Sequence, residues 1–262
     1  MTRLMLSVTI LFAIAANHHV AAEVQTESIE YSDGDVSLRG FLAWDDASDQ
    51  RRPGILVVHE WWGLNDYARG RAKQLAEMGY VAFALDMYGK GKVTEHPKQA
   101  GEWATMIRKN ADAWRARARA GLKILKQQEQ VDPNRLAAIG YCFGGSTVLH
   151  LAFGGDDLRG VVSFHGSLPV PTADETARTK SRLLVCHGAA DRFIPTEQIG
   201  KFQQALDAGG VDWQMVYYAG AKHSFTNPGA DAKNIDGIGY NKKADLRSWG
   251  HMQAFFDEIF AE

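Results

Sequence analysis

The pentapeptide Gly-Tyr-Cys-Phe-Gly at residues 140–144 constrains the fold of this 262-residue chain more than any other segment. An apolar run at residues 136–139 precedes it, and a stretch rich in small residues follows it. Glycine on either side lets the backbone turn sharply from a strand into a helix, where a side chain would collide with the neighbouring backbone. Such a turn raises Cys142 above the edge of a sheet. There the first N–H groups of the helix, together with its dipole, favour negative charge on sulfur.

Strand-like and helix-like segments alternate along the rest of the chain. Residues 54–58 form a continuous apolar run, which is typical of a parallel strand covered on both faces. Further strands are expected at residues 80–85, 135–140, 160–164, 182–187 and 213–218, and residues 36–44 indicate an antiparallel hairpin strand. The order predicts an α/β fold with a mostly parallel, doubly wound sheet of about eight strands and an antiparallel N-terminal edge.

Helical spacing of apolar residues predicts the covering helices. They are expected at residues 66–78, 97–128, 145–153, 196–208 and 243–260. The longest contains Trp103 and Trp114, which this spacing assigns to the core rather than to a binding site. Residues 168–180 are too few for a lid domain, and residues 224–240 are expected to be the most mobile element beside the site.

Composition indicates one globular domain over residues 23–262. Apolar residues make up 45% of the chain and charged residues 23%, and no linker or repeat interrupts the alternation. The net charge of −2 favours neither nucleic acid nor an anionic membrane as a partner. We expect a monomer that acts on a small molecule without a cofactor.

The first 22 residues have the pattern of a secretory signal peptide. Arg3 gives a positive start, residues 4–16 are apolar, and Ala22 ends a small-residue cleavage signal. The apolar stretch is shorter than the roughly 20 residues of a membrane span. We therefore expect an exported, periplasmic protein with residues 1–22 removed; a retained N-terminal anchor is the alternative.

Two cysteines in an exported chain raise the question of a disulfide. Cys142 follows one predicted strand and Cys186 lies in another, with the strand at residues 160–164 expected between them. One intervening strand separates the two by roughly 10 Å, whereas a disulfide tolerates about 7 Å between Cα atoms. We therefore predict two free thiols.

Three residues with catalytic side chains each follow a predicted strand: Cys142, Asp191 and His223. The carboxyl ends of parallel strands meet at one edge of a sheet, so these side chains should converge there. A histidine can accept the thiol proton and return it to a leaving group, while an aspartate fixes the imidazole tautomer. Taken singly, each has a structural explanation as a buried small residue, a turn residue or a solvated loop residue. Their order, nucleophile, acid, histidine, is that of α/β-hydrolases and favours catalysis.

Backbone N–H groups should stabilise the oxyanion of such a reaction. The expected donors are Phe143, which follows the nucleophile, and Trp61 in the loop after Val58. Both contributions come from the backbone, so the identity of either side chain matters mainly for packing.

The dipeptide His59-Glu60 also begins a zinc-protease motif. That motif requires a second histidine four residues after the first, and position 63 is glycine. We therefore predict no metal site. His59, His165 and His187 all follow strands and are expected to be hydrogen-bonded packing residues near the site.

Four motifs give the chain a specific resemblance to a known family. They lie at residues 57–63, 140–145, 187–195 and 219–225, with the sequences VVHEWWG, GYCFGG, HGAADRFIP and AGAKHSF. With them the mature chain resembles the dienelactone hydrolase family, the carboxymethylenebutenolidases. Cysteine in the elbow, combined with glutamate after an earlier strand, distinguishes this family from serine esterases of the same fold.

The resemblance implies an α/β-hydrolase fold and hydrolysis of an ester-like bond, typically in an enol lactone. It implies an acyl-cysteine intermediate and a triad of Cys142, Asp191 and His223. It also implies that Glu60 interacts with the resting thiol and helps to activate it, as a carboxylate of raised proton affinity can.

Two positions depart from the family pattern. Where dienelactone-cleaving members hold a substrate carboxylate with two arginines, this chain has Lys90 and Asn227. A lysine lacks the planar fork of arginine, so we expect a neutral or differently shaped lactone or ester. Tyr88, Trp61 and Phe143 are candidates for lining the pocket, and packing is an equal alternative for each. A broader carboxylesterase or thioesterase is one alternative, and a non-catalytic periplasmic ligand-binding relative is another.

Overall fold

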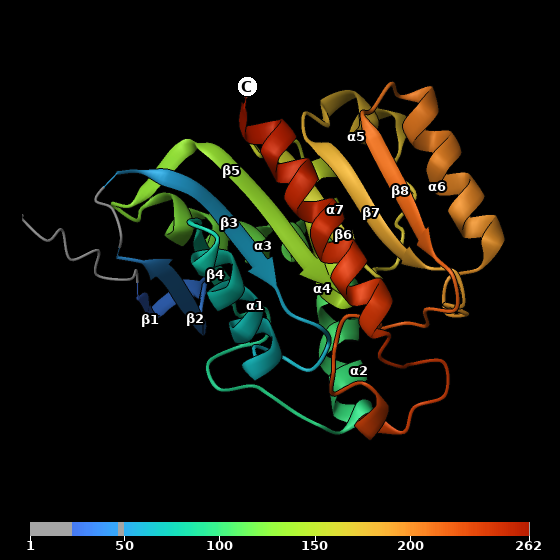
Figure 1. The fold of residues 1–262 in the computed structure, drawn as a ribbon, viewed down its shortest axis with the longest axis horizontal. Helices are drawn as coiled ribbons and strands as arrows, with labels where there is room; N and C mark the ends of the chain where they lie inside the picture. The colour runs from blue at the N-terminus through green and yellow to red at the C-terminus, as the bar shows by residue number, and fades with distance from the viewer. Residues whose placement is uncertain (1–22, 47–49, 262) are drawn as a thin grey trace, which may run out of the picture.

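Eight strands of the described chain form one sheet in the order β1-β2-β4-β3-β5-β6-β7-β8 (Figure 1). The computed structural model describes residues 23–46 and 50–261, so the predicted signal peptide lies outside it. The strands are β1 (Val24–Asp33), β2 (Val36–Asp45), β3 (Arg52–Val58), β4 (Val81–Leu85), β5 (Val131–Tyr141), β6 (Gly160–Phe164), β7 (Arg182–Gly188) and β8 (Trp213–Tyr218). The helices are α1 (Asp66–Glu77), α2 (Pro97–Arg108), α3 (Ala111–Lys126), α4 (Phe143–Phe153), α5 (Ala173–Arg178), α6 (Thr196–Ala208) and α7 (Lys242–Ala261), with a 3-10 turn η1 (Asp231–Lys233).

Strand direction confirms the expected fold class. β1 and β2 form an antiparallel hairpin, and β2 pairs antiparallel with β4. From β4 to β8 the remaining neighbours are parallel. The carboxyl ends of β3, β5, β7 and β8 therefore meet at one edge of the sheet, which is where the predicted catalytic residues follow.

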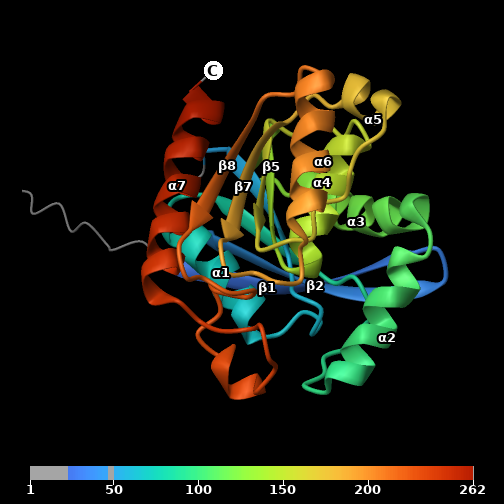
Figure 2. The same ribbon diagram turned by 90° about the vertical axis from the view of Figure 1, so that its right-hand side faces the viewer.

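Helices cover both faces of the sheet and create two cores. Figure 2 shows α1 and α7 on one side and α3, α4 and α6 on the other. Strand side chains alternate between them: in β3, Ile55 and Val57 pack with α1 and α7, whereas Leu56 and Val58 pack with α3 and α4. Each fully buried side chain of this kind stabilises the fold by about 1.5–3 kcal/mol. This burial on both faces explains the continuous apolar runs in the sequence.

The single helix predicted over residues 97–128 is wrong, because the structure has two helices there. α2 ends at Arg108 and α3 begins at Ala111. Asn110 caps α3, its side-chain oxygen accepting from the N–H groups of Asp112 at 2.9 Å and Ala113 at 3.0 Å. This cap satisfies donors that the first turn leaves unpaired, so the helix starts anew. The assignment of both tryptophans to the core is confirmed.

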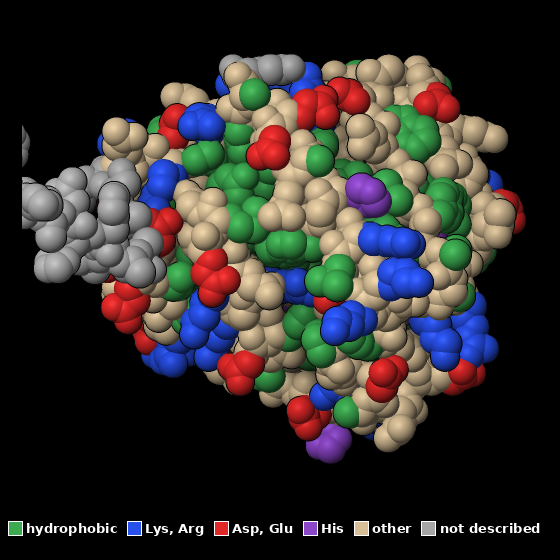
Figure 3. Space-filling view, viewed as in Figure 1, with side chains coloured by type: hydrophobic (Ala, Val, Ile, Leu, Met, Phe, Trp, Pro, Cys, Tyr) green, Lys and Arg blue, Asp and Glu red, His purple; other side chains and the backbone are tan. Residues whose placement is uncertain are grey.

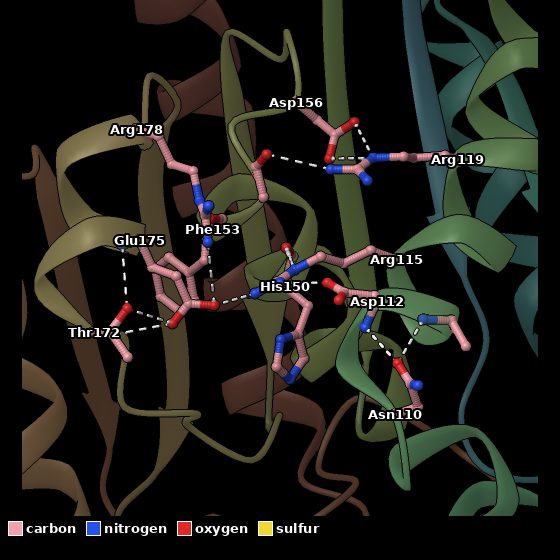
Figure 4. A network of polar contacts seen from close by, with 12 residues as sticks. Asn110, Asp112, Arg115, Arg119, His150, Phe153, Asp156, Thr172, Glu175 and Arg178 are labelled. Carbon is pink, nitrogen blue, oxygen red and sulfur yellow. Dashed lines mark hydrogen bonds and ion pairs between the residues drawn. The ribbon is translucent and has the colours of Figure 1, made fainter.

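A polar network fastens the far end of α4 to its neighbours (Figure 4). Arg115 donates from Nε to the carbonyl of His150 at 3.0 Å and forms an ion pair with Glu175. Arg178 donates to the carbonyl of Phe153 at 2.8 Å. The last carbonyls of a helix lack partners within it, so these guanidinium groups complete its C-terminus. The network fixes the helix whose other end holds Cys142.

Other elements agree with expectation apart from small shifts. α4 begins at Phe143, two residues before the predicted start, and the chain between β6 and β7 contains the short helix α5. Cys142 and Cys186 are free, and β6 lies between their strands as expected. Across residues 23–46 and 50–261, no helix is both long and apolar enough to cross a membrane. Lysines and arginines are interspersed with acidic residues on the face in Figure 3.

Candidate active site

Cys142 occupies a strained turn between β5 and α4. Its φ is 55° and its ψ −111°, a conformation that costs about 1–3 kcal/mol for a residue with a side chain. A Cβ on Gly140 would lie 2.0 Å from the carbonyl oxygen of Gly144, and a Cβ on Gly144 would lie 2.2 Å from that of Val58. Only glycine fits at these two positions. The sharp turn predicted from the pentapeptide is therefore present, and it depends on both glycines.

Asp191, His223 and Cys142 lie together at the carboxyl edge of the sheet. Asp191 follows β7, and its Oδ2 lies 2.8 Å from Nδ1 of His223, in the loop after β8. The side chain of Cys142 lies close enough to the same imidazole to raise the pKa of His223. The second oxygen of Asp191 accepts from the N–H of Phe193 at 3.0 Å, which fixes the carboxylate. The structure thus brings together three residues that are far apart in the sequence.

The charges in this chain alter the proton affinity of His223. Burial alone would lower its pKa. Negative charge on Cys142, hydrogen bonds to Asp191 and Cys142, and the charge of Asp191 outweigh burial and raise the pKa of His223 to about 10. The imidazole therefore holds its second proton at neutral pH.

Glu60 is buried in the turn after β3 and bonded at both carboxylate oxygens. Ser224 donates from its hydroxyl to Oε1 at 2.7 Å, and Asn227 donates from Nδ2 to Oε2 at 2.6 Å. Burial raises the pKa of Glu60, and these two hydrogen bonds oppose the rise. Both carboxylate oxygens of Glu60 therefore accept hydrogen bonds from the loop that contains His223, and neither is bonded to the thiol of Cys142.

Both residues at the family's arginine positions have partners within the protein. Lys90 forms an ion pair with Glu30 on β1, with 2.5 Å between Nζ and Oε1. Asn227 uses Nδ2 for Glu60, and its Oδ1 accepts from the N–H of Gly229 at 2.9 Å. The structure therefore places Asn227 in the site but directs Lys90 toward the N-terminal hairpin.

Tyr88 lies near Cys142. Its ring centroid is 5.5 Å from that of Phe143 and 5.1 Å from that of His59. Its buried hydroxyl has no hydrogen-bond partner among the described residues. Burial, and after it the charge of Cys142, raises the pKa of Tyr88. On the same side of the site, the guanidinium carbon of Arg108 lies 5.5 Å from the Phe143 centroid.

The predicted oxyanion donors are Phe143, next to Cys142 in the chain, and Trp61, which follows β3. Phe143 is the first residue of α4, where a helix supplies no carbonyl for its N–H. Trp61 follows Glu60 in the turn after β3, with its ring 4.9 Å from that of Trp62. Both N–H groups belong to turns at the carboxyl edge of the sheet.

The three neighbouring histidines are held inside the protein. His59 accepts at Nε2 from the N–H of Met87 at 3.2 Å, and its Nδ1 contacts the carbonyl of Glu60. The ring of His187 packs at 5.6 Å against that of Tyr217. Burial lowers the pKa of His59, His165 and His187. No cluster of three or more potential metal ligands occurs among the described residues.

Sequence reasoning missed two residues that complete the site. Ser224 immediately follows His223 and binds Glu60, and Thr226 lies 2.7 Å from Nε2 of His165. Their only signal in the sequence is that hydroxyl residues stand one and three positions after the predicted histidine, and such residues are also common in ordinary turns.

Comparison with known proteins decides the family. The sequence profile of the dienelactone hydrolase family matches residues 38–260, which is most of the chain. The chain belongs to the dienelactone hydrolase family. As a dienelactone hydrolase family member it is a hydrolase that acts on ester bonds, and its substrate is a small molecule.

Individual relatives of this dienelactone hydrolase family member span nearly the same length. The solved structure named m3DLH is 41% identical, with a TM-score of 0.87, and the match covers 90% of this chain and 98% of that one. A dienelactone hydrolase-like promiscuous phosphotriesterase, P91, from metagenomic libraries is 38% identical, with a TM-score of 0.88 and the same coverage. Protein usf of Aquifex pyrophilus is 29% identical over 237 residues, 88% of this chain and 98% of its own length.

Proposed function

We propose that this protein hydrolyses small lactones or esters through an acyl-cysteine intermediate with Cys142 as nucleophile. The observation that carries the proposal is the 2.8 Å contact between Asp191 and Nδ1 of His223, with Cys142 beside the same imidazole. The raised pKa of His223 supports an imidazolium beside the sulfur that can protonate a leaving group. A binding module would have no need of a strained cysteine paired with a buried imidazole.

The first half of the reaction forms the acyl-enzyme. The sulfur of Cys142 attacks the carbonyl carbon, and the carbonyl electron pair moves to oxygen, where the N–H groups of Phe143 and Trp61 stabilise it. As the tetrahedral intermediate collapses, the carbon–oxygen bond to the leaving group breaks. His223 gives its Nε2 proton to that departing oxygen. In a lactone, the leaving alcohol remains attached to the acyl group.

The second half releases the acid. His223, now neutral, removes a proton from water as the water oxygen attacks the thioester carbon. Collapse of this second intermediate breaks the carbon–sulfur bond and restores the thiolate beside the imidazolium. Asp191 accepts from Nδ1 throughout and stabilises each imidazolium.

Glu60 has a positioning role in this arrangement. Its two hydrogen bonds join the turn that contains Trp61 to the loop that contains His223. To accept the thiol proton, as the family resemblance implies, its carboxylate would have to leave Ser224 and Asn227. We propose that in the resting enzyme it stays with these two donors.

We propose a neutral lactone or ester as the substrate. The support is that Lys90 is paired with Glu30 and that Asn227 is committed to Glu60 and Gly229. A neutral phosphotriester is a second candidate of the same charge class. The similarity to P91, a promiscuous phosphotriesterase, favours testing it.

The test compares wild type with Cys142→Ala and Cys142→Ser on enol lactones, aryl esters, thioesters and aryl phosphotriesters. Cys186→Ala is the matched control, because Cys186 is a free cysteine in the interior of β7. The proposal expects turnover of lactones or esters that Cys142→Ala abolishes and Cys186→Ala retains. Turnover unchanged in Cys142→Ala, or no turnover in wild type, contradicts it. If thioesters or phosphotriesters are the best substrates, the proposed substrate class is wrong, but the proposed role of Cys142 as nucleophile stands.

We further propose that the protein is exported and that residues 1–22 are removed. The support is the signal-like pattern that ends at Ala22. Intact mass of the protein from the periplasmic fraction should correspond to a chain that begins at Glu23. Full-length protein in the membrane fraction would instead indicate a retained anchor.

A further inference from the structure

His165 lies between the two arms of the predicted triad. It follows β6, is fully buried and has a φ of 41°. Its Nδ1 accepts from the backbone N–H of Cys142 at 3.1 Å, and its Nε2 is 2.7 Å from Oγ1 of Thr226. Thr226 stands three residues after His223 in the same loop. One imidazole ring therefore bridges the nucleophile elbow and the histidine loop.

The partners of His165 determine where its proton lies. The N–H of Cys142 can only donate, so the facing Nδ1 carries no hydrogen, and a neutral ring must hold its proton on Nε2. That N–H then donates to the Thr226 hydroxyl oxygen. Burial, followed by the charges of His223 and Arg71 and that of His187, holds the pKa of His165 well below its ordinary value. A neutral ring therefore lies with its centroid 5.4 Å from that of the charged His223.

Thr226 is itself anchored to two helices. Its Oγ1 lies 2.6 Å from the hydroxyl of Tyr67 on α1, and its carbonyl accepts from Nη2 of Arg71 at 2.7 Å. Arg71 also forms a 2.5 Å ion pair with Asp245 on α7. These contacts are buried or half-buried, so the Thr226 end of the bridge is fixed to the helices that cover one face of the sheet.

We propose that His165 is a positioning residue, a neutral strut that holds the Cys142 backbone at a fixed separation from His223, with Thr226 as its anchor. The proposal rests on the proposed function, in which sulfur and imidazole must stay in contact. The N–H of Cys142 also donates to the carbonyl of Phe164 at 3.0 Å. Because that bond remains, loss of the strut loosens the elbow without unfolding it.

The test removes the strut's anchor and compares it with a neighbouring bond. Thr226→Val keeps the shape of the side chain and removes the acceptor for His165. Tyr67→Phe is the matched control: it removes the other hydrogen bond to the same oxygen, but Thr226 keeps its bond to His165 and stays anchored through its carbonyl to Arg71. Misplacement of a catalytic group by about 1 Å can slow a reaction by up to about 100-fold. We expect Thr226→Val to lower kcat by about tenfold with KM within about twofold of wild type, and Tyr67→Phe to stay within about twofold in both.

A second readout needs no substrate. The pKa of His223, followed by NMR of its imidazole, should fall in Thr226→Val because the charge of Cys142 no longer lies at its resting position, and it should stay near the wild-type value in Tyr67→Phe. A merely structural role would lower the melting temperature without moving this pKa. If Thr226→Val does not fold, His165→Asn serves instead, since asparagine tolerates positive φ and can still accept from Cys142 but cannot reach Thr226; the same fall is expected.

Equal kcat and equal His223 pKa in Thr226→Val and Tyr67→Phe would contradict the positioning role of His165. Failure of the proposed function would give a distinguishable result. Wild type would then show no turnover that depends on Cys142, while the His223 pKa would still report whether His165 positions the elbow.

Discussion

Asn227 donates a hydrogen bond of 2.6 Å from Nδ2 to Oε2 of Glu60, and both side chains are buried. With Ser224 on the other oxygen, Glu60 is fully occupied by the loop that contains His223. Cys142 instead lies close enough to His223 to raise the pKa of its imidazole. In the proposed mechanism this leaves the imidazole as the partner of the Cys142 sulfur, while Glu60 holds two loops together.

Removal of the Asn227 amide should weaken that connection. The hydrogen bond lowers the pKa of Glu60 whereas burial raises it, so in Asn227→Ala the pKa of Glu60 rises further. We expect kcat/KM to fall about three- to tenfold at neutral pH and its acidic limb to move to higher pH. A pH–rate profile measures both effects. Asn134→Ala, at the opposite end of β5, is the control, and a profile indistinguishable from that control would contradict the role given to Asn227.

The protonation of His223 should depend on Cys142. Charge on Cys142 is the largest of the influences that raise the pKa of His223 to about 10, against the lowering effect of burial. In Cys142→Ala that influence is gone, so the His223 pKa should drop below its wild-type value. NMR titration of the imidazole measures the change. In wild type, kcat/KM should decline as pH rises through about 10, because the imidazolium that protonates the leaving group is lost.

Asp191 should matter through the tautomer of His223. In Asp191→Asn the amide no longer offers an anionic acceptor to Nδ1, so the imidazolium loses its stabilising charge and the ring its fixed orientation. We expect kcat to decrease by about 10³-fold with little change in KM. Steady-state kinetics with Asp174→Asn on α5 as control checks this. A decrease of less than about tenfold would show that Asp191 is not the acid of the triad.

Two glycine-to-alanine substitutions should have opposite effects on stability. A Cβ at Gly144 would lie 2.2 Å from the carbonyl oxygen of Val58, so Gly144→Ala should lower the free energy of unfolding by about 2–4 kcal/mol. Gly70, inside α1, has open space around a Cβ, so Gly70→Ala should raise it by about 0.5–1 kcal/mol. Chemical denaturation of both variants gives the values. An unaffected Gly144→Ala protein would mean that the elbow does not need its glycine.

Replacement of Lys90 should have little effect on the preference for neutral or anionic substrates. Because Lys90 is paired with Glu30, Lys90→Gln should leave kcat/KM within about twofold for neutral esters and for esters with an added carboxylate. Competition between matched neutral and anionic esters measures the preference. A clear preference for the anionic ester would contradict the neutral class, and Arg108→Gln would then show whether the guanidinium over Phe143 causes it.

Much of the fold follows from local signals in the sequence. Apolar runs such as residues 54–58 mark buried strands, and catalytic side chains placed after such runs converge because parallel strands end together. The strained turn at Cys142 was predictable because its glycines are a local requirement. The break between α2 and α3 was missed, because helical periodicity continues across Asn110 and only the capping contacts show that the helix restarts.

The remaining features of the site depend on contacts between distant segments. Glu60 and Asn227 are 167 positions apart, and Lys90 and Glu30 are brought together only by the N-terminal hairpin. Comparison with the family pattern predicts that Lys90 and Asn227 lie near a substrate. It does not show that their side chains are bonded to Glu30 and Glu60. In the same way, His165 is predicted near the site because it follows β6. Its bridge to Thr226 depends on Arg71 of α1 and its ion pair with α7, which fix the loop.

In the proposed mechanism Cys142 forms a covalent acyl intermediate with the substrate. Rapid acid quench during turnover of an aryl acetate, followed by peptide mass spectrometry, tests this most directly. We predict one acetyl group on the peptide that contains Cys142, none on the peptide that contains Cys186, and accumulation of the acylated form in a variant that deacylates slowly, such as Asp191→Asn. Turnover that proceeds at the wild-type rate in Cys142→Ala, or acylation of another residue, would contradict the claim.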